Sequence, residues 1–113
     1  MVMTGTLNES TPTLSLSSVK GRRYYVGINL KNLVNGDDLT ITLERQDGAG
    51  YVVYDIYNVV KTAGVIIIND VPQSLEEINI ENIYVNDSHG VRFTLSFNSE
   101  TWRDLPYWYD KMI

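Results

Sequence analysis

The chain has 113 residues, of which 43% are hydrophobic and 20% are charged, and it contains no cysteine. This length and composition are typical of one folded globular domain rather than a disordered chain. The absence of cysteine excludes disulfides, thiolate metal sites and a cysteine nucleophile. The formal net charge of −5 argues against nucleic-acid binding, because affinity for phosphate backbones comes from clustered Lys and Arg side chains.

No stretch of the sequence has the roughly 18 consecutive apolar residues that a membrane-spanning helix needs. The first residues contain no Lys or Arg ahead of an apolar segment, so they lack the pattern of a secretory signal peptide. Residues 1–12 are rich in Thr and Ser and end at Pro12, which predicts an extended N-terminal arm rather than a helix. We therefore expect one domain over residues 13–113, preceded by this arm, with no membrane partner.

Alternation of apolar and polar residues predicts most of the strands. This pattern indicates strands around residues 14–16, 24–31, 39–43 and 91–97, whose inward-facing side chains are Leu14, Leu16, Tyr24, Val26, Ile28, Leu30, Leu39, Ile41, Leu43, Val91, Phe93, Leu95 and Phe97. The pair Asn35-Gly36 between the second and third of these strands readily adopts the positive φ angles of a tight turn, so it favours a hairpin or a corner there.

Three further strands have less regular patterns. Residues 51–57 alternate but show apolar groups on both sides, which predicts a strand that is buried twice or covered by a partner. Residues 65–70 are β-branched at their centre, and residues 75–85 fit a strand with a bulge near Glu81-Asn82. Seven or eight short strands without a sustained helical period predict an all-β fold, namely an antiparallel β-sandwich with a jelly-roll-like topology.

The sequence is poor in groups that carry catalysis. His89 is the only histidine and follows Ser88, but adjacent residues on an extended chain point to opposite sides and do not form a nucleophile and base pair. No pair of carboxylates is singled out for hydrolysis. Calcium would need loop oxygens, and these loops lack the acidic spacing of an EF-hand. The loop candidates are Asn35, Asp37, Asp38, Asn86 and Asp87. We predict no catalytic residue, no metal ligand and no cofactor.

The C-terminal segment 102–113 concentrates aromatic and aliphatic side chains and forms an aromatic tail. Such a mixture is typical of protein contacts, where rigid rings contribute large buried areas. The predicted interface comprises Tyr51, Val53, Tyr57, Trp102, Leu105, Pro106, Tyr107, Trp108, Tyr109, Met112 and Ile113. Two alternatives stay open at this point. The tail either folds back to close the sandwich of the same chain or covers a neighbouring subunit.

The order of several motifs resembles that of a known group of proteins. The motifs are Asn32-Leu33 followed by Gly36-Asp37, the strand Gly90 to Leu95, and Leu105-Pro106-Tyr107. Across about residues 22–109 the chain is similar to small β-sandwich virion structural proteins of tailed phages and archaeal viruses. The resemblance implies a structural or decorating role in a virion, and it assigns no catalytic residue.

We therefore expect a non-enzymatic virion structural protein, either a decoration protein or a minor capsid subunit, that is assembled in the host cytoplasm. Its expected partners are further copies of the chain, capsid proteins, or both, with no nucleic acid. The alternative is a carbohydrate-binding module in which Trp102 and Trp108 stack on sugar rings, so a glycan is also a possible ligand. A hydrolase is the third and weakest interpretation.

Overall fold

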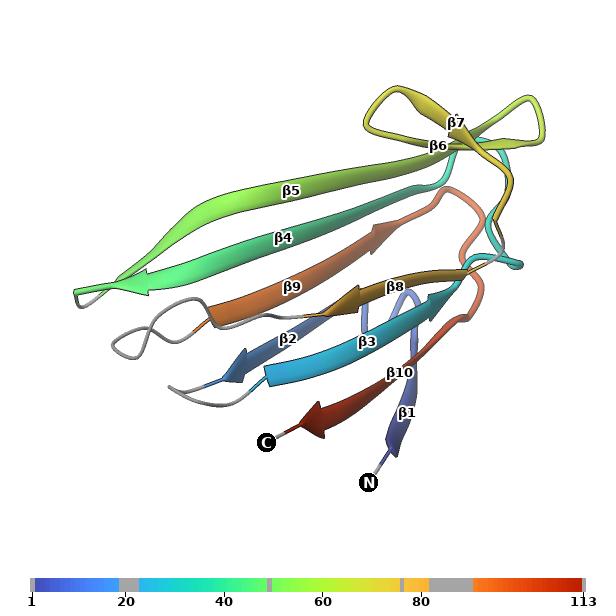
Figure 1. Cartoon of the computed structure of the whole chain (residues 1–113). Coiled ribbons are helices and arrows are strands. Elements are labelled where there is room, and N and C mark those ends of the chain that lie inside the picture. The colour runs from blue at the N-terminus through green and yellow to red at the C-terminus, as the bar shows by residue number, and fades with distance from the viewer. Residues whose placement is uncertain (1, 19–22, 49, 76, 82–90, 113) are drawn as a thin grey trace.

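The computed structural model describes residues 2–18, 23–48, 50–75, 77–81 and 91–112. Within these ranges the protein forms ten β-strands in two antiparallel sheets that pack face to face, so the expected all-β sandwich is confirmed (Figure 1). The four-stranded sheet has the order β1 (Val2–Leu7), β10 (Leu105–Met112), β3 (Arg23–Asn29) and β8 (Glu77–Glu81). The six-stranded sheet has the order β2 (Thr13–Ser18), β9 (Val91–Asn98), β4 (Asp38–Asp47), β5 (Gly50–Thr62), β6 (Val65–Ile68) and β7 (Val71–Gln73).

Eight of these strands have the jelly-roll arrangement. The pairs β1 with β10, β2 with β9, β3 with β8, and β4 with β5 are nested one inside the next, as in a single long hairpin. Pairing of β10 with β3 and of β9 with β4 then rolls this hairpin into two layers. Strands β6 and β7 form a short hairpin that extends the second layer beyond β5 (Figure 1).

The prediction of seven or eight strands is too low, since three of the ten strands in the described chain have weak sequence signals. Strand β1 lies inside the segment predicted as an extended arm, and it pairs with β10 from Val2 to Leu7. Strand β7 has three residues and contains Pro72, which marks an edge position. Strand β10 is the predicted aromatic tail, and it does not alternate clearly because it carries rings on both faces. The bulge expected near residues 81–82 lies partly outside the described residues.

The core lies between the two sheets and includes most of the side chains that the alternation predicted to face inward, together with residues such as Val59 that it did not predict. On β3, Val26 and Ile28 are buried. Buried side chains on β4 and β9 complete the opposite wall, and these are Leu39, Ile41, Leu43, Phe93, Leu95 and Phe97. Leu7 of β1 and Leu105 of β10 close the core at the end where the chain crosses between the layers. Burial of this set supplies the main stabilisation of the fold.

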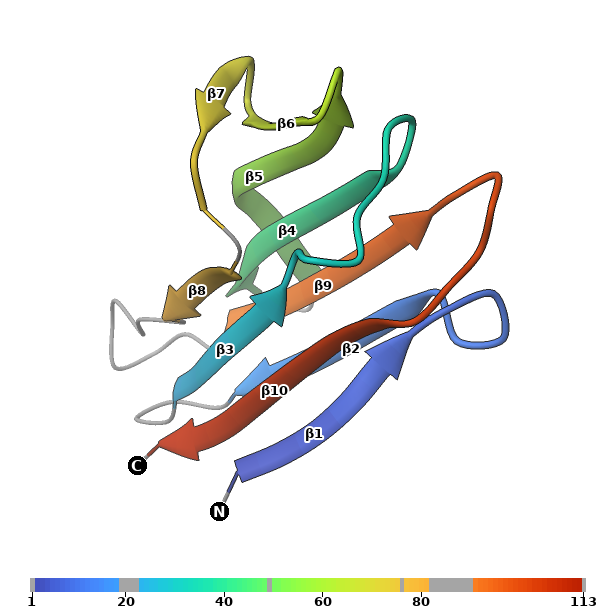
Figure 2. The ribbon, with the colours of Figure 1, turned by 90° about the vertical axis from the view of Figure 1, so that its right-hand side faces the viewer.

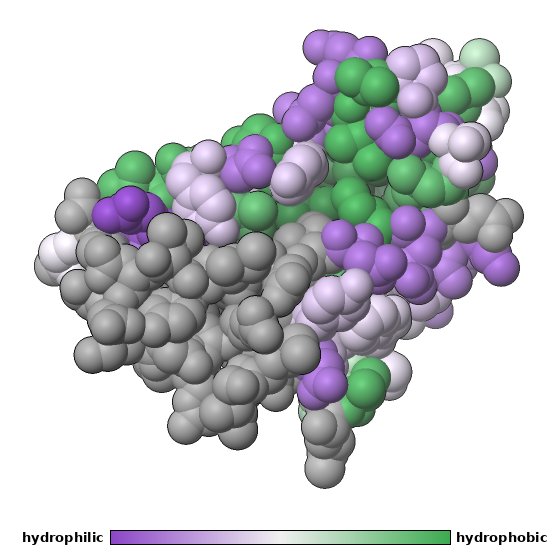
Figure 3. All heavy atoms as spheres, viewed as in Figure 1, coloured by the Kyte–Doolittle hydropathy of each residue, from purple (hydrophilic) through white to green (hydrophobic). Residues whose placement is uncertain are grey.

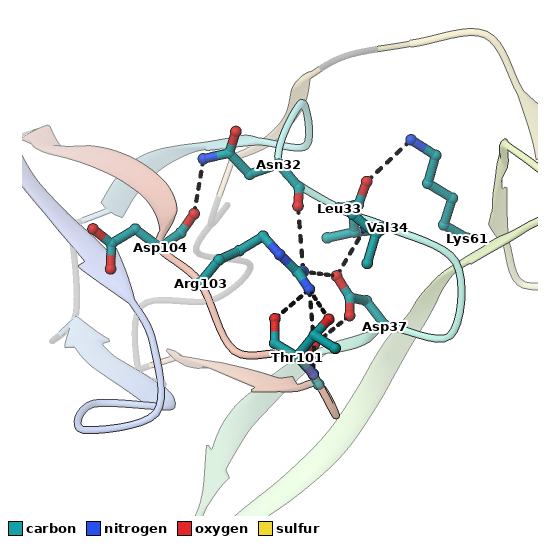
Figure 4. A network of polar contacts seen from close by, with 9 residues as sticks. Asn32, Leu33, Val34, Asp37, Lys61, Thr101, Arg103 and Asp104 are labelled. Atoms are coloured by element: carbon teal, nitrogen blue, oxygen red, sulfur yellow. Dashed lines mark hydrogen bonds and ion pairs between the residues drawn. The ribbon is translucent and has the colours of Figure 1, made fainter.

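One buried carboxylate holds together the loops that cross between the layers at this end. Asp37, in the connection from β3 to β4, is 2% exposed. Its Oδ2 accepts a hydrogen bond from the Val34 backbone N–H at 2.9 Å and forms an ion pair with Arg103. Its Oδ1 accepts a hydrogen bond from the Ser99 hydroxyl at 2.5 Å. Because Ser99 and Arg103 belong to the connection from β9 to β10, Asp37 joins two crossovers (Figure 4).

Further polar contacts extend this network. The Asn32 side chain donates to the Asp104 backbone carbonyl at 2.9 Å, which is a second link between the same two crossovers. The Asn8 side chain, in the connection from β1 to β2, donates to the Asp104 carboxylate at 3.2 Å. On the other side, Lys61 of β5 donates to the Leu33 carbonyl at 3.0 Å. We call this set of contacts the crossover network, and Figure 2 views the molecule from the end where it lies.

We expect Asp37→Ala to lower the free energy of unfolding by about 3 kcal/mol, because it leaves Arg103 without its buried partner. Urea denaturation of the full chain measures this change. The matched control is Asp38→Ala, since Asp38 is the exposed neighbour, and its effect should stay within about 0.5 kcal/mol. Equal stability of the two variants would show that the crossover network does not hold the sheets together.

Candidate interaction surfaces

The predicted aromatic tail forms strand β10, an inner strand of the four-stranded sheet. Strand β10 lies between β1 and β3, with Tyr107 opposite Ile28 and Tyr109 opposite Val26. The two tyrosine rings stack at a centroid distance of 6.3 Å and pack against the core. Burial, followed by the neighbouring Tyr109, raises the pKa of Tyr107. Leu105 at the start of the strand is fully buried. These side chains therefore close the sandwich of the same chain.

Trp102, another predicted interface residue, contacts the core in the same way. It precedes β10 and packs edge-to-face on Phe97, with ring centroids 5.5 Å apart and planes at 85°. Its side chain is partly buried against the hydrophobic core. Trp102 and Trp108, the two stacking residues of the alternative carbohydrate-binding interpretation, thus lie in different environments.

Trp108 lies on the outer face of the four-stranded sheet, because it alternates along β10 with the inward-facing tyrosines. Its cross-strand neighbour is Gly27 of β3. A Cβ atom added to Gly27 would lie 2.2 Å from two indole atoms, so the indole occupies the space above this glycine. The indole also stacks on Tyr25, at 5.6 Å between centroids and 26° between planes. Its Nε1 lies 3.5 Å from Glu77 Oε2. We call Trp108 and Tyr25 the aromatic platform.

A run of exposed apolar side chains, which we call the β5 patch, lies on the six-stranded sheet. The exposed fractions are 51% for Val52, 50% for Val53, 44% for Tyr54 and 42% for Ile56. A β-bulge at Tyr54 shifts the pairing with β4, so Val53 and Ile56 share the outer face in spite of their odd spacing. In Figure 3 apolar residues gather along the upper rim, where Figure 1 places β5 and the β6–β7 hairpin.

The two other predicted interface residues of β5 have intramolecular contacts. Tyr51 lies under the Arg92 guanidinium, 4.0 Å from its ring centroid, and Arg92 forms a bidentate ion pair with Glu44 at 2.9 and 3.0 Å. Tyr57 packs against the core, and a hydrogen bond to the Asp55 carboxylate, followed by burial, raises its pKa. Of the three predicted residues on this strand, Val53 is the exposed one.

The described residues offer little for catalysis or metal binding. They contain no group of three or more His, Cys, Asp or Glu side chains placed to hold a metal ion. Asp37, a calcium candidate from the sequence, is occupied by its bonds to Ser99, Val34 and Arg103. Among the described residues, a hollow of about 560 Å³ beside the β6–β7 hairpin is lined by no carboxylate and includes Lys31 and Lys61. No helix within the described ranges is long and apolar enough to cross a bilayer.

Several sequence-predicted positions lie outside what the structure describes. Ser88, His89, Asn86 and Asp87 are among residues 82–90, and Ile113 is also outside the described ranges. For Met112 the structure describes the strand position but not the side chain. Pro106 is partly buried on β10, opposite Thr6 of β1.

Sequence reasoning placed Gly27 and Tyr25 on the outer face but did not identify them as neighbours of Trp108. The signal for Gly27 was present, because a glycine in the interior of a strand often marks a place where another group approaches closely. Tyr25 was predicted to face away from the core, but nothing in the local sequence relates it to a tryptophan more than 80 positions away. The crossover network was missed for the same reason, since Asp37 and Arg103 are distant in sequence.

Comparison with protein-family models, with curated proteins and with solved structures finds no match to this chain.

We expect Gly27→Ala to displace the Trp108 indole, because the new Cβ overlaps the ring. In a Trp102→Phe background, where Trp108 is the one indole, acrylamide quenching should increase and stability should fall by about 1–3 kcal/mol. Gly50→Ala is the matched control, since its Cβ would meet no atom within 4 Å. Unchanged quenching in the Gly27 variant would contradict the close packing of indole on glycine.

Proposed function

We propose that the protein is a non-enzymatic structural subunit of a virion that assembles with further copies of itself through the β5 patch. The observation that carries this proposal is the apolar exposure of Val52, Val53, Tyr54 and Ile56, which occupy four of the five positions 52–56 of one strand. Val53 and Ile56 share the outer face of the sheet, and exposed apolar side chains that share one face are typical of protein contact sites. The jelly-roll arrangement supports the viral role by analogy, because capsid domains often have it, and the sequence resemblance points the same way.

The free side of β5 favours contact with a second sheet. Strand β6 pairs with β5 only from Val59 to Thr62 among the described residues, although β5 begins at Gly50. The Asn69 side chain bonds Asn58 N–H and the Ile56 carbonyl, at 2.8 and 3.1 Å, and so extends the pairing slightly. The preceding part of β5 has no Lys or Pro that would block pairing with another chain. Apart from Asp55 and the bulge at Tyr54, this edge is apolar and open among the described residues, which suits it to strand addition.

The size of the patch indicates a weak contact between two copies. Full burial of one Val, Ile or Tyr side chain contributes about 1.5–3 kcal/mol. Association of two proteins costs roughly 4–15 kcal/mol of lost freedom, so four such side chains give a modest affinity. Symmetric assembly repeats a weak contact many times and makes the whole particle stable. This balance fits a shell or decoration subunit better than a stable isolated dimer.

The proposal predicts that Val53→Lys combined with Ile56→Lys abolishes self-association. The wild-type sedimentation coefficient should rise with protein concentration up to about 1 mM, where even a contact of about 4 kcal/mol is visible. The double variant should stay monomeric, with an unchanged melting temperature, because both side chains are exposed.

The matched control carries Ser15→Lys and Ser96→Lys, which add the same charge to exposed positions on the same sheet. This control should associate like the wild type. A wild-type protein that remains monomeric over the whole concentration range, or a control that loses association equally, would refute assembly through the β5 patch.

A further inference from the structure

We propose that the outer face of the four-stranded sheet binds a neutral carbohydrate, with one pyranose ring stacked on Trp108. This surface belongs to the other layer of the sandwich, so the proposal is independent of assembly through the β5 patch. It concerns a site formed by Trp108, Tyr25, Thr4, Asn79 and Glu77, which come from all four strands of the sheet.

The indole is held flat against the sheet by its neighbours. Gly27 has no side chain to lift the ring, and a Cβ there would lie 2.2 Å from the indole. Tyr25 stacks on the same indole at 26°, which extends the flat surface along β3. Glu77 lies 3.5 Å from the indole nitrogen and fixes the orientation of the ring. A ring that is already ordered loses little conformational entropy when a ligand stacks on it.

Polar side chains surround this apolar surface on the same face. Thr4 is the cross-strand partner of Trp108 on β1, and Asn79 is the partner of Gly27 on β8, so the two flank the indole in one row. Thr4, Asn79 and Glu77 are all exposed. A hydroxyl, an amide and a carboxylate together provide donors and acceptors for sugar hydroxyls. A pyranose presents an apolar face with hydroxyls around its rim, which matches this arrangement of one ring within a polar border.

The composition of the face favours a sugar over a protein partner and a neutral sugar over an anionic one. Among the described outward-facing residues of this sheet, the aliphatic ones, Val2 and Pro106, lie at its margins. The centre of a protein contact is usually depleted in charged residues, whereas this face carries Glu77 beside the indole. Glu77 carries negative charge on this face and lies 3.5 Å from the indole nitrogen, so it would repel carboxylated or sulfated sugars.

Titration followed by NMR tests the site directly, because the chain has two tryptophans whose indole N–H groups lie in different environments. The probes are neutral gluco-, manno-, galacto- and chito-oligosaccharides, each added to about 10 mM so that millimolar affinity is detected. A sulfated heparin oligosaccharide serves as the anionic comparison. We expect at least one neutral series to shift the Trp108 indole signal in a saturable way, while the Trp102 signal stays in place and the sulfated probe has no effect.

Variants then relate the binding to the named side chains. Glu77→Ala and Asn79→Ala change exposed groups outside the core and should each weaken binding about fivefold, as expected for one lost hydrogen bond. Trp108→Ala should abolish binding. Trp102→Phe is the matched control and should bind normally, and sedimentation of all variants should match the wild type, which separates this site from the β5 patch.

Four results would overturn the proposal. The first is the absence of a Trp108 shift with all four neutral series. The second is an equal shift of both indole signals, which would indicate a nonspecific effect. The third is normal binding by Trp108→Ala or by both rim variants, which would place the sugar elsewhere on the protein. A Trp108 signal that responds to protein concentration alone would assign the face to a contact between copies and would equally refute the sugar site.

Discussion

The alignment of the two layers depends on the hydrogen bonds and the ion pair formed by the buried Asp37 carboxylate. Hydrophobic burial drives the sheets together but does not fix how one layer is placed on the other, because apolar contacts have little directionality. Asp37 bonds the backbone of its own crossover and, through Ser99 and Arg103, the crossover from β9 to β10. A buried charge tolerates few alternative positions of its partners. We infer that the crossover network selects one relative placement of the sheets.

The aromatic residues of strand β10 have two different roles. Tyr107 and Tyr109 face inward and complete the core, while Trp108 faces outward above Gly27. A single short segment thus both closes the fold and provides the candidate site. The β5 patch lies on the other layer, so the proposed assembly and the proposed sugar binding would use different layers of the molecule.

Much of the fold could be predicted because its strands alternate regularly. The buried faces of β3, β4 and β9 follow directly from period-two patterns such as Phe93, Leu95 and Phe97. The pattern failed at β10, where both faces bear rings, and at Tyr54, where a bulge changes which side chains face outward. The surfaces were harder to predict than the core, since Trp108 meets Tyr25 and Asp37 meets Arg103 only after the chain has folded. Local sequence carries no signal for such distant pairs.

The nesting of the strand pairs has a consequence for how the protein is made. Val2 of β1 pairs with Asp110 of β10, so the beginning of the chain finds its partner only when nearly all of the sequence has left the ribosome. Pairings between residues so far apart form slowly, and unpaired strands are exposed meanwhile. The innermost pair, β4 with β5, is local and can form early. Synthesis therefore favours a folding order that runs from the middle of the chain outward, with the four-stranded sheet completed last.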